Sequence, residues 1–104
     1  MYIYNVTINV SDSVHDEFLI WIKKHIPEVL ATGKFTEARF TQVLVEEEME
    51  GTTYSVQYTA KTRADLDAYY EEDAPRLREE GMKKFADQML GFRTELKIIE
   101  DFKA

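Results

Sequence analysis

The sequence predicts a single α+β domain with the element order β-α-β-β-α-β. The N-terminus alternates polar and apolar residues in the two-residue period of a strand, and a helical pattern of apolar residues follows. Two further strand patterns, a second helical pattern and a last strand pattern fill the rest of the chain. A length of 104 residues, of which 44% are hydrophobic, is typical of one compact domain with one core. We therefore expect residues 1–104 to fold as one unit.

A first strand is expected over residues 2–10. Tyr4, Val6 and Ile8 alternate with Asn5 and Thr7, which indicates that one side of this strand lies in the core. The next three residues, 11–13, are of the types that cap helix N-termini. The strand is therefore expected to end there and a helix to begin.

This first helix is expected to run to about His25. Its apolar stripe covers roughly 100° of arc and consists of Val14, Phe18, Trp21, Ile22 and His25. The imidazole of His25 therefore points toward the core or into a cleft. Pro27 lacks the amide hydrogen that a helix interior needs. We expect the helix to bend after His25 and a new short helix to cover residues 28–32, closed by Gly33.

Two strands are expected next, over residues 35–46 and 52–60. The first is rich in Phe, Thr and Val, and the second has the sequence TTYSVQYTA. The charged segment EEEMEG between them is typical of a hairpin tip. Its glutamates could attract a divalent cation, but they lack the ligand spacing of a calcium loop, so we expect a solvated turn.

The second helical region is expected to begin at Thr62, which with Asp65 resembles a helix cap. Pro75 interrupts this region, so we expect two helical pieces, the second ending at Gly91. The apolar positions of the region are Leu66, Tyr69, Leu77, Met82, Phe85 and Met89. A fourth strand then follows, in which apolar residues alternate with charged ones up to Ile98.

This order of elements is that of a ferredoxin-like fold, a four-stranded antiparallel sheet with the helices on one face. We expect the covered face to carry Tyr4, Val6, Ile8, Tyr54, Val56, Tyr58, Phe92, Leu96 and Ile98. The open face is expected to carry Asn5, Thr7, Ser55, Gln57, Arg93 and Glu95. Arg39 and Arg93 are expected to pair with acidic neighbours on that open face.

The second strand is apolar on both sides. Phe40 and Leu44 lie on one side, opposite Thr41, Val43 and Val45, and the pattern does not decide which set meets the helices. A strand that is apolar on both sides is usually buried on both sides. We infer that a second copy of the chain covers the open face, so that the protein is a homodimer.

Composition excludes several classes of function. Thirteen Lys and Arg against twenty Asp and Glu give a net charge of -7, which repels nucleic acid and anionic lipid. The chain lacks an apolar run long enough to span a membrane and the features of a secretory signal, so no membrane partner is expected. It also has no cysteine, which excludes thiolate metal sites and fits a cytoplasmic protein.

Two interpretations of His25 remain open. Buried polar groups usually find partners, which favours a packed, hydrogen-bonded core residue. Alternatively, His25 lies in an aromatic pocket between helices and sheet, where an imidazole could act as a general base or bind an anion. The expected ligand-binding residues are Tyr4, Trp21, His25, Tyr54 and Tyr58. No cofactor and no metal site is expected. His15 and His25 would lie about fifteen Å apart along the helix, too far to share one metal ion.

Several segments resemble a known family. HIPEVLATGKF after a tryptophan-bearing helix, then TYSVQY, a Tyr-x-x-x-x-Ala-Pro segment and a late FRT are similar to the bacterial family called domain of unknown function 4286. The resemblance covers nearly the whole chain. It implies a ferredoxin-like domain of the dimeric α/β-barrel type with no established activity. That family tends to have histidine before the Ala-Pro pair where this chain has Asp73, so a role of that histidine does not transfer.

Two classes of function follow. The first is a homodimeric binding or regulatory domain that holds a small, partly apolar molecule, since the sequence shows an aromatic pocket but no catalytic constellation. The alternative is a cofactor-independent enzyme of the small monooxygenase or isomerase type that uses His25, an idea that depends on fold-level analogy. An enclosed cavity that touches His25 would keep the enzyme hypothesis, whereas a ring packed without a void would remove it.

Overall fold

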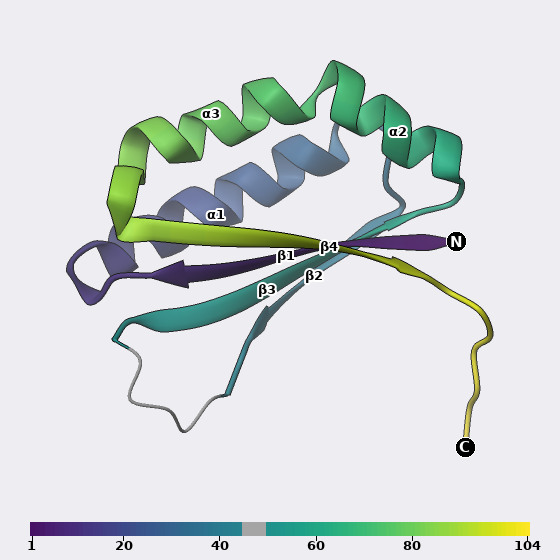
Figure 1. Ribbon diagram of the computed structural model, residues 1–104, viewed down its shortest axis with the longest axis horizontal. Coiled ribbons are helices and arrows are strands. Elements are labelled where there is room, and N and C mark those ends of the chain that lie inside the picture. Colours follow the sequence, from purple (N-terminus) through teal and green to yellow (C-terminus); the bar gives the residue numbers. More distant parts are fainter. Residues whose placement is uncertain (45–49) are drawn as a thin grey trace.

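The computed structural model of the protein describes residues 1–44 and 50–104 and confirms the expected order of elements (Figure 1). The strands are β1 (Tyr2–Val10), β2 (Glu37–Gln42), β3 (Thr52–Ala60) and β4 (Met89–Lys97), and the helices are α1 (His15–Leu30), α2 (Arg63–Glu72) and α3 (Ala74–Phe85). Two short 3₁₀ turns, Asp12–Val14 and Ala86–Gln88, precede α1 and β4. The strands form one antiparallel sheet in the order β2-β3-β1-β4, and all three helices lie on one face of it.

The core lies between the helices and the two central strands. On the sheet side it contains Tyr4, Ile8, Tyr54, Val56 and Tyr58, each at most 7% exposed. On the helix side it contains Phe18, Ile22, Val29, Leu66, Leu77 and Phe85. The expected covered face of β1 and β3 is therefore confirmed. Its burial drives the fold, because each large apolar side chain removed from water contributes about 1.5–3 kcal/mol.

Helix α1 continues through Pro27, so the expected new helix over residues 28–32 is wrong. Pro27 lies in the last turn of α1, where its missing N–H removes one hydrogen bond near the helix end. Val29, two residues later, is 1% exposed, and its burial holds the last turn against the core. Gly33 follows with φ +79°, a conformation that glycine adopts without strain.

The two-piece second helix is confirmed. Thr62 caps α2 by accepting a 3.1 Å hydrogen bond from the Asp65 amide, as expected. Pro75 lies in the first turn of α3, where its missing N–H costs nothing. However, α3 ends at Phe85 rather than Gly91, and Met89 and Gly91 belong to β4. The turn over residues 86–88 places Ala86 at φ +47° and redirects the chain into the sheet.

The expected faces of β4 are reversed. Arg93 lies opposite Val6 and Glu95 opposite Tyr4, so both charged side chains face the helices. Glu95 accepts a 2.8 Å bond from Arg63 of α2 and a 2.6 Å bond from the Tyr70 hydroxyl, and these bonds lower the pKa of its carboxyl group. The charges are tolerated there because β4 is an edge strand, over which long side chains reach solvent.

Three apolar residues of β4 consequently lie on the open face of the sheet, whereas Met89 lies on the helix side. Leu90, Phe92 and Leu96 are 58%, 61% and 46% exposed. The other residues expected on this face are confirmed, since Asn5, Thr7, Ser55 and Gln57 alternate with the buried positions of β1 and β3. An exposed row of large apolar side chains on one side of a sheet is typical of an interaction surface.

The ambiguity of the second strand is resolved in part. Phe40 faces the helices and packs on Tyr54, with ring centroids 5.0 Å apart. Val43 continues the pairing with β3 beyond the end of β2, and Leu44 is 87% exposed. Val45 and most of the expected hairpin tip lie outside the described residues. At the other end of the chain, the segment after β4 runs away from the helix layer with Ile99 and Phe102 exposed (Figure 1).

Candidate functional site

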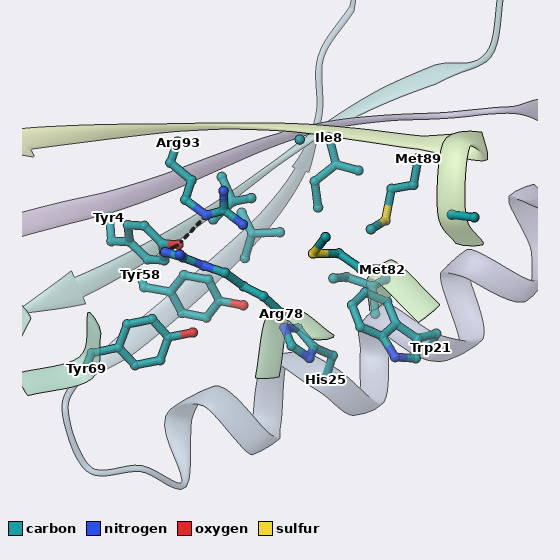
Figure 2. A pocket seen from close by; sticks show the side chains of 15 residues that line it. Tyr4, Ile8, Trp21, His25, Tyr58, Tyr69, Arg78, Met82, Met89 and Arg93 are labelled. Atoms are coloured by element: carbon teal, nitrogen blue, oxygen red, sulfur yellow. Dashed lines mark hydrogen bonds between the residues drawn. The ribbon is translucent and has the colours of Figure 1, made fainter. Parts of the chain in front are cut away.

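A cavity of about 400 Å³ lies between the helix layer and the sheet (Figure 2). Side chains from both central strands, the edge strand β4 and all three helices line it. The lining residues are Tyr4, Val6, Ile8, Trp21, Ile22, His25, Val56, Tyr58, Tyr69, Arg78, Met82, Ala86, Met89, Gly91 and Arg93. Its volume lies within the range of ordinary small-molecule sites, about 300–1,000 Å³.

Four of the five residues expected at a binding site line this cavity: Tyr4, Trp21, His25 and Tyr58. Tyr54 does not. Its ring stacks on Phe18 at 5.7 Å between centroids, and its hydroxyl contacts the His15 Nε2 atom. Tyr54 therefore belongs to the core beside the N-terminal turn of α1.

One end of the cavity is polar. The Tyr4 hydroxyl oxygen accepts a 3.0 Å hydrogen bond from Arg78 Nη2 of α3 and a 2.9 Å bond from Arg93 Nε of β4. The two guanidinium groups thus meet at one phenol, as Figure 2 shows. The stem of Arg78 also brings its guanidinium carbon to 5.9 Å from the centre of the Tyr70 ring, a cation–π distance.

Two further phenols lie beside these arginines. The hydroxyls of Tyr58 and Tyr69 point toward the same space in Figure 2. Burial raises the pKa of Tyr69 to about 12 and the pKa of Tyr58 still further. Both hydroxyls therefore keep their protons at neutral pH and can donate hydrogen bonds to a bound molecule.

The other end of the cavity is apolar. Trp21, Met82, Met89 and Ile8 form it. Gly81 allows α3 to approach Trp21, because a Cβ atom at this position would lie 2.8 Å from the indole Cη2 atom. The two methionines supply flexible side chains that can adapt to the shape of a ligand.

His25 lies on the wall between the two ends. Its ring stacks on Trp21, with centroids 4.4 Å apart and planes at 20°. Its Nδ1 atom is buried and has no hydrogen-bond partner in the part of the chain that the structure describes. Burial lowers the pKa of His25 below the ordinary 6.5, and the Glu80 carboxylate opposes this shift in part. The imidazole is therefore neutral at pH 7.

The lowered pKa predicts that His25 makes stability depend on pH. Below about pH 6.5 the unfolded chain binds a proton at His25 more readily than the folded chain does, so the free energy of unfolding falls as pH falls. This loss of stability stops once the pH lies below the folded-state pKa of His25, where both states carry the proton. We expect His25→Gln to weaken this dependence between pH 7 and 5.5 in denaturant unfolding, relative to the control His15→Gln. An equally steep dependence in both variants would contradict the shift.

Three possible metal ligands also meet at His25. One donor atom from each of His25, Glu28 and Glu80 lies within 4.8 Å of the others. Imidazole and carboxylate suit several divalent ions. Both glutamates are exposed, and exposed acidic groups often lie close together without binding an ion. The three residues therefore have the donor types of a divalent-metal site, and nothing else among the described residues indicates one. The spacing of His25 and Glu28 on one helix was visible in the sequence, but Glu80 comes from α3.

Sequence reasoning missed the residues that α3 and β4 bring to the cavity. Arg78, Met82 and Met89 come from the region expected to be the second of two helical pieces, and Arg93 was expected on the open face. Arg78 directly follows the apolar Leu77 in a helix rich in charged residues, so nothing in the sequence indicated that it would line a cavity.

The fold and the cavity define a ferredoxin-like α+β domain. Among solved structures, it is similar to a dimeric ferredoxin-like protein from an uncultured marine organism (TM-score 0.72, 14% identity, 97% of each chain covered). It is also similar to a dimeric ferredoxin-like protein of unknown function from Jannaschia sp. (TM-score 0.54, 21% identity, 94% of this chain and 100% of that chain covered). A protein from Deinococcus radiodurans provisionally described as an antibiotic biosynthesis monooxygenase is similar as well (TM-score 0.61, 10% identity, 100% and 98% covered).

The chain belongs to the family described as domain of unknown function 4286, whose model matches residues 1–99. The resemblance seen in its sequence segments is thereby confirmed. Among curated proteins, none matches the chain significantly. Within residues 1–44 and 50–104, no helix combines the length and the apolar character that crossing a bilayer requires.

Proposed function

We propose that this protein is a small homodimeric binding domain that holds one small, partly apolar molecule in the cavity. The cavity itself carries this proposal, because it joins a polar end of arginines and phenols to an apolar end of Trp21 and two methionines. Pockets that are mostly apolar with a few convergent polar groups are the usual sites for small ligands. We place the protein in the cytoplasm, in keeping with its lack of cysteine.

We further propose that the dimer forms through the open face of the sheet. Leu90, Phe92 and Leu96 expose large apolar side chains there. The last residues of the chain, with exposed Ile99 and Phe102, leave the sheet on the side away from the helices (Figure 1). The dimeric ferredoxin-like proteins of similar fold support the formation of a dimer by analogy. A second copy would remove these side chains from water and leave both cavities accessible.

Ligand binding can be tested with a probe pair and a variant that fills the cavity. Gly91 faces the cavity opposite Ile8, and a Cβ atom there would meet only the Thr7 carbonyl oxygen, at 3.9 Å. Gly91→Leu should therefore extend its side chain into the cavity, while Gly91→Ala serves as the matched control. The probes are 2-cyclohexylethanol and cyclohexylacetate, and emission of Trp21, the single tryptophan, reports binding.

We expect saturable binding of at least one probe by the wild type and by Gly91→Ala, and at least about tenfold weaker binding by Gly91→Leu, since the cavity no longer has room. Native mass spectrometry of freshly isolated protein should also find a retained small molecule in the wild type and not in Gly91→Leu. A wild type that responds to neither probe, or a Gly91→Leu variant that binds as well as the wild type, would contradict the proposal.

A second candidate function is a cofactor-independent enzyme that uses His25 as a general base. The observation that favours it is the neutral imidazole on the wall of a partly open cavity, where the ring is not packed without a void. The retained molecule distinguishes the two functions. Incubated in air with the wild type, it should stay unchanged if the protein only binds. Conversion that stops in His25→Gln while binding persists would identify an enzyme.

A further inference from the structure

The two arginines of the cavity differ from Arg63 and Arg76 in their partners. Arg63 pairs with Asp67 and Glu95, and Arg76 pairs with Asp73. In residues 1–44 and 50–104, by contrast, no carboxylate lies within 4.0 Å of the Arg78 or Arg93 guanidinium group. The chain carries seven more acidic than basic side chains, so acidic partners are not scarce. The cavity nevertheless holds two cations without a counter-charge from the described residues.

This arrangement has an energetic cost that a ligand can relieve. Both guanidinium groups donate to the same Tyr4 oxygen, so two like charges are held close together. The Arg78 Nε atom is buried and has no hydrogen-bond partner in the described part of the chain. A buried donor without an acceptor is unfavourable. An anion between the arginines would offset the repulsion and could accept from their remaining N–H groups.

The surroundings select the kind of anion. Guanidinium groups bind carboxylates through paired hydrogen bonds, and the protonated hydroxyls of Tyr58 and Tyr69 can donate to the same oxygens. The opposite end of the cavity, formed by Trp21, Met82, Met89 and Ile8, suits an apolar group. A fully hydrated inorganic anion would leave that end unfilled, whereas a compact molecule with one acidic group and one hydrocarbon part suits both ends.

We propose that the ligand of this cavity is a small organic carboxylate whose acidic group lies between Arg78 and Arg93 and whose apolar part lies against Trp21 and the methionines. This inference rests on the proposed binding function and names its ligand class. Arg78 and Arg93 act as the specificity-determining residues, and Tyr4 positions both of them through its hydroxyl oxygen.

The test compares the two probes, which match in their ring but differ in charge. Cyclohexylacetate should bind the wild type at least about tenfold more tightly than 2-cyclohexylethanol, and added salt should reduce this preference. Arg78→Met and Arg93→Met should each bring the two affinities to within about threefold, because methionine keeps much of the stem and loses the charge. The control Arg76→Met, on the same helix but paired with Asp73 and absent from the cavity lining, should keep the full preference.

The outcomes separate this inference from the proposed function. Equal binding of both probes by the wild type would overturn the carboxylate inference and leave the binding function intact. A preference that survives in both Arg78→Met and Arg93→Met would also overturn it. If neither probe binds, both ideas fall. Arg93 lies on an exposed edge strand, so Arg93→Met keeps the test decisive even if Arg78→Met fails to fold.

Discussion

The double substitution Phe92→Glu with Leu96→Glu should convert the proposed dimer into a folded monomer. Both side chains are exposed in the single chain, at 61% and 46%, so charge there leaves the fold intact. In a dimer formed through the open face, each charge would be buried without a partner at a cost of several kcal/mol. We expect the dissociation constant to rise at least about 100-fold. Sedimentation at micromolar concentration measures this directly.

A control separates the open face from exposed apolar surface in general. Ile20 is 62% exposed but belongs to helix α1, on the opposite layer. Ile20→Glu should leave the dimer unchanged. A wild type that sediments as a monomer at micromolar concentration would remove the dimer from the proposed function. A double variant that remains dimeric would show that the copies meet elsewhere.

Phe18→Ala should lower the free energy of unfolding by about 3–5 kcal/mol, the usual cost of removing a buried aromatic ring. Phe18 is fully buried and contacts three rings, with centroids 6.2 Å from Trp21, 5.7 Å from Tyr54 and 5.9 Å from Phe85. Trp21 would lose part of its support, so its emission should shift as well. Denaturant unfolding gives the stability change.

The matched control is Phe102→Ala, the same substitution at a side chain that is 83% exposed. It should change the stability of the single chain by no more than about 0.5 kcal/mol. A loss below about 1 kcal/mol for Phe18→Ala would mean that the neighbouring rings collapse into the vacated space, and that the core tolerates more rearrangement than its packing indicates.

The strands at the centre of the sheet could be predicted from sequence, whereas the edge strand could not. In β1 and β3, one face is buried and the other polar, so the two-residue period identifies the sides. In β4 the same period is present, but Arg93 and Glu95 reach solvent over the sheet edge from the helix side. Alternation then separates two faces without telling which one meets the helices. Pro27 failed as a signal because burial of Val29 outweighs one lost hydrogen bond.

The site was predictable only where one element determines it. Helical spacing on α1 placed Trp21 and His25 together, and strand alternation placed Tyr4 and Tyr58 on the covered face. Alternation gives a face but no position along it, which is why Tyr54 was expected in the cavity. Arg78 and Arg93 are fifteen positions apart in sequence and meet only through Tyr4, near the start of the chain. No local pattern contains such a three-element contact.

The alternation of β4 has a thermodynamic consequence. Arg93 lines the cavity, while Phe92, the next residue along the same backbone, lies on the opposite face. A ligand held by Arg93 and a second copy held by Phe92 would therefore act on one edge strand from its two sides. Any free-energy coupling between these two events must be reciprocal. If an occupied cavity tightens the association of two chains by some factor, association tightens occupancy by that same factor, and protein concentration becomes a determinant of ligand affinity.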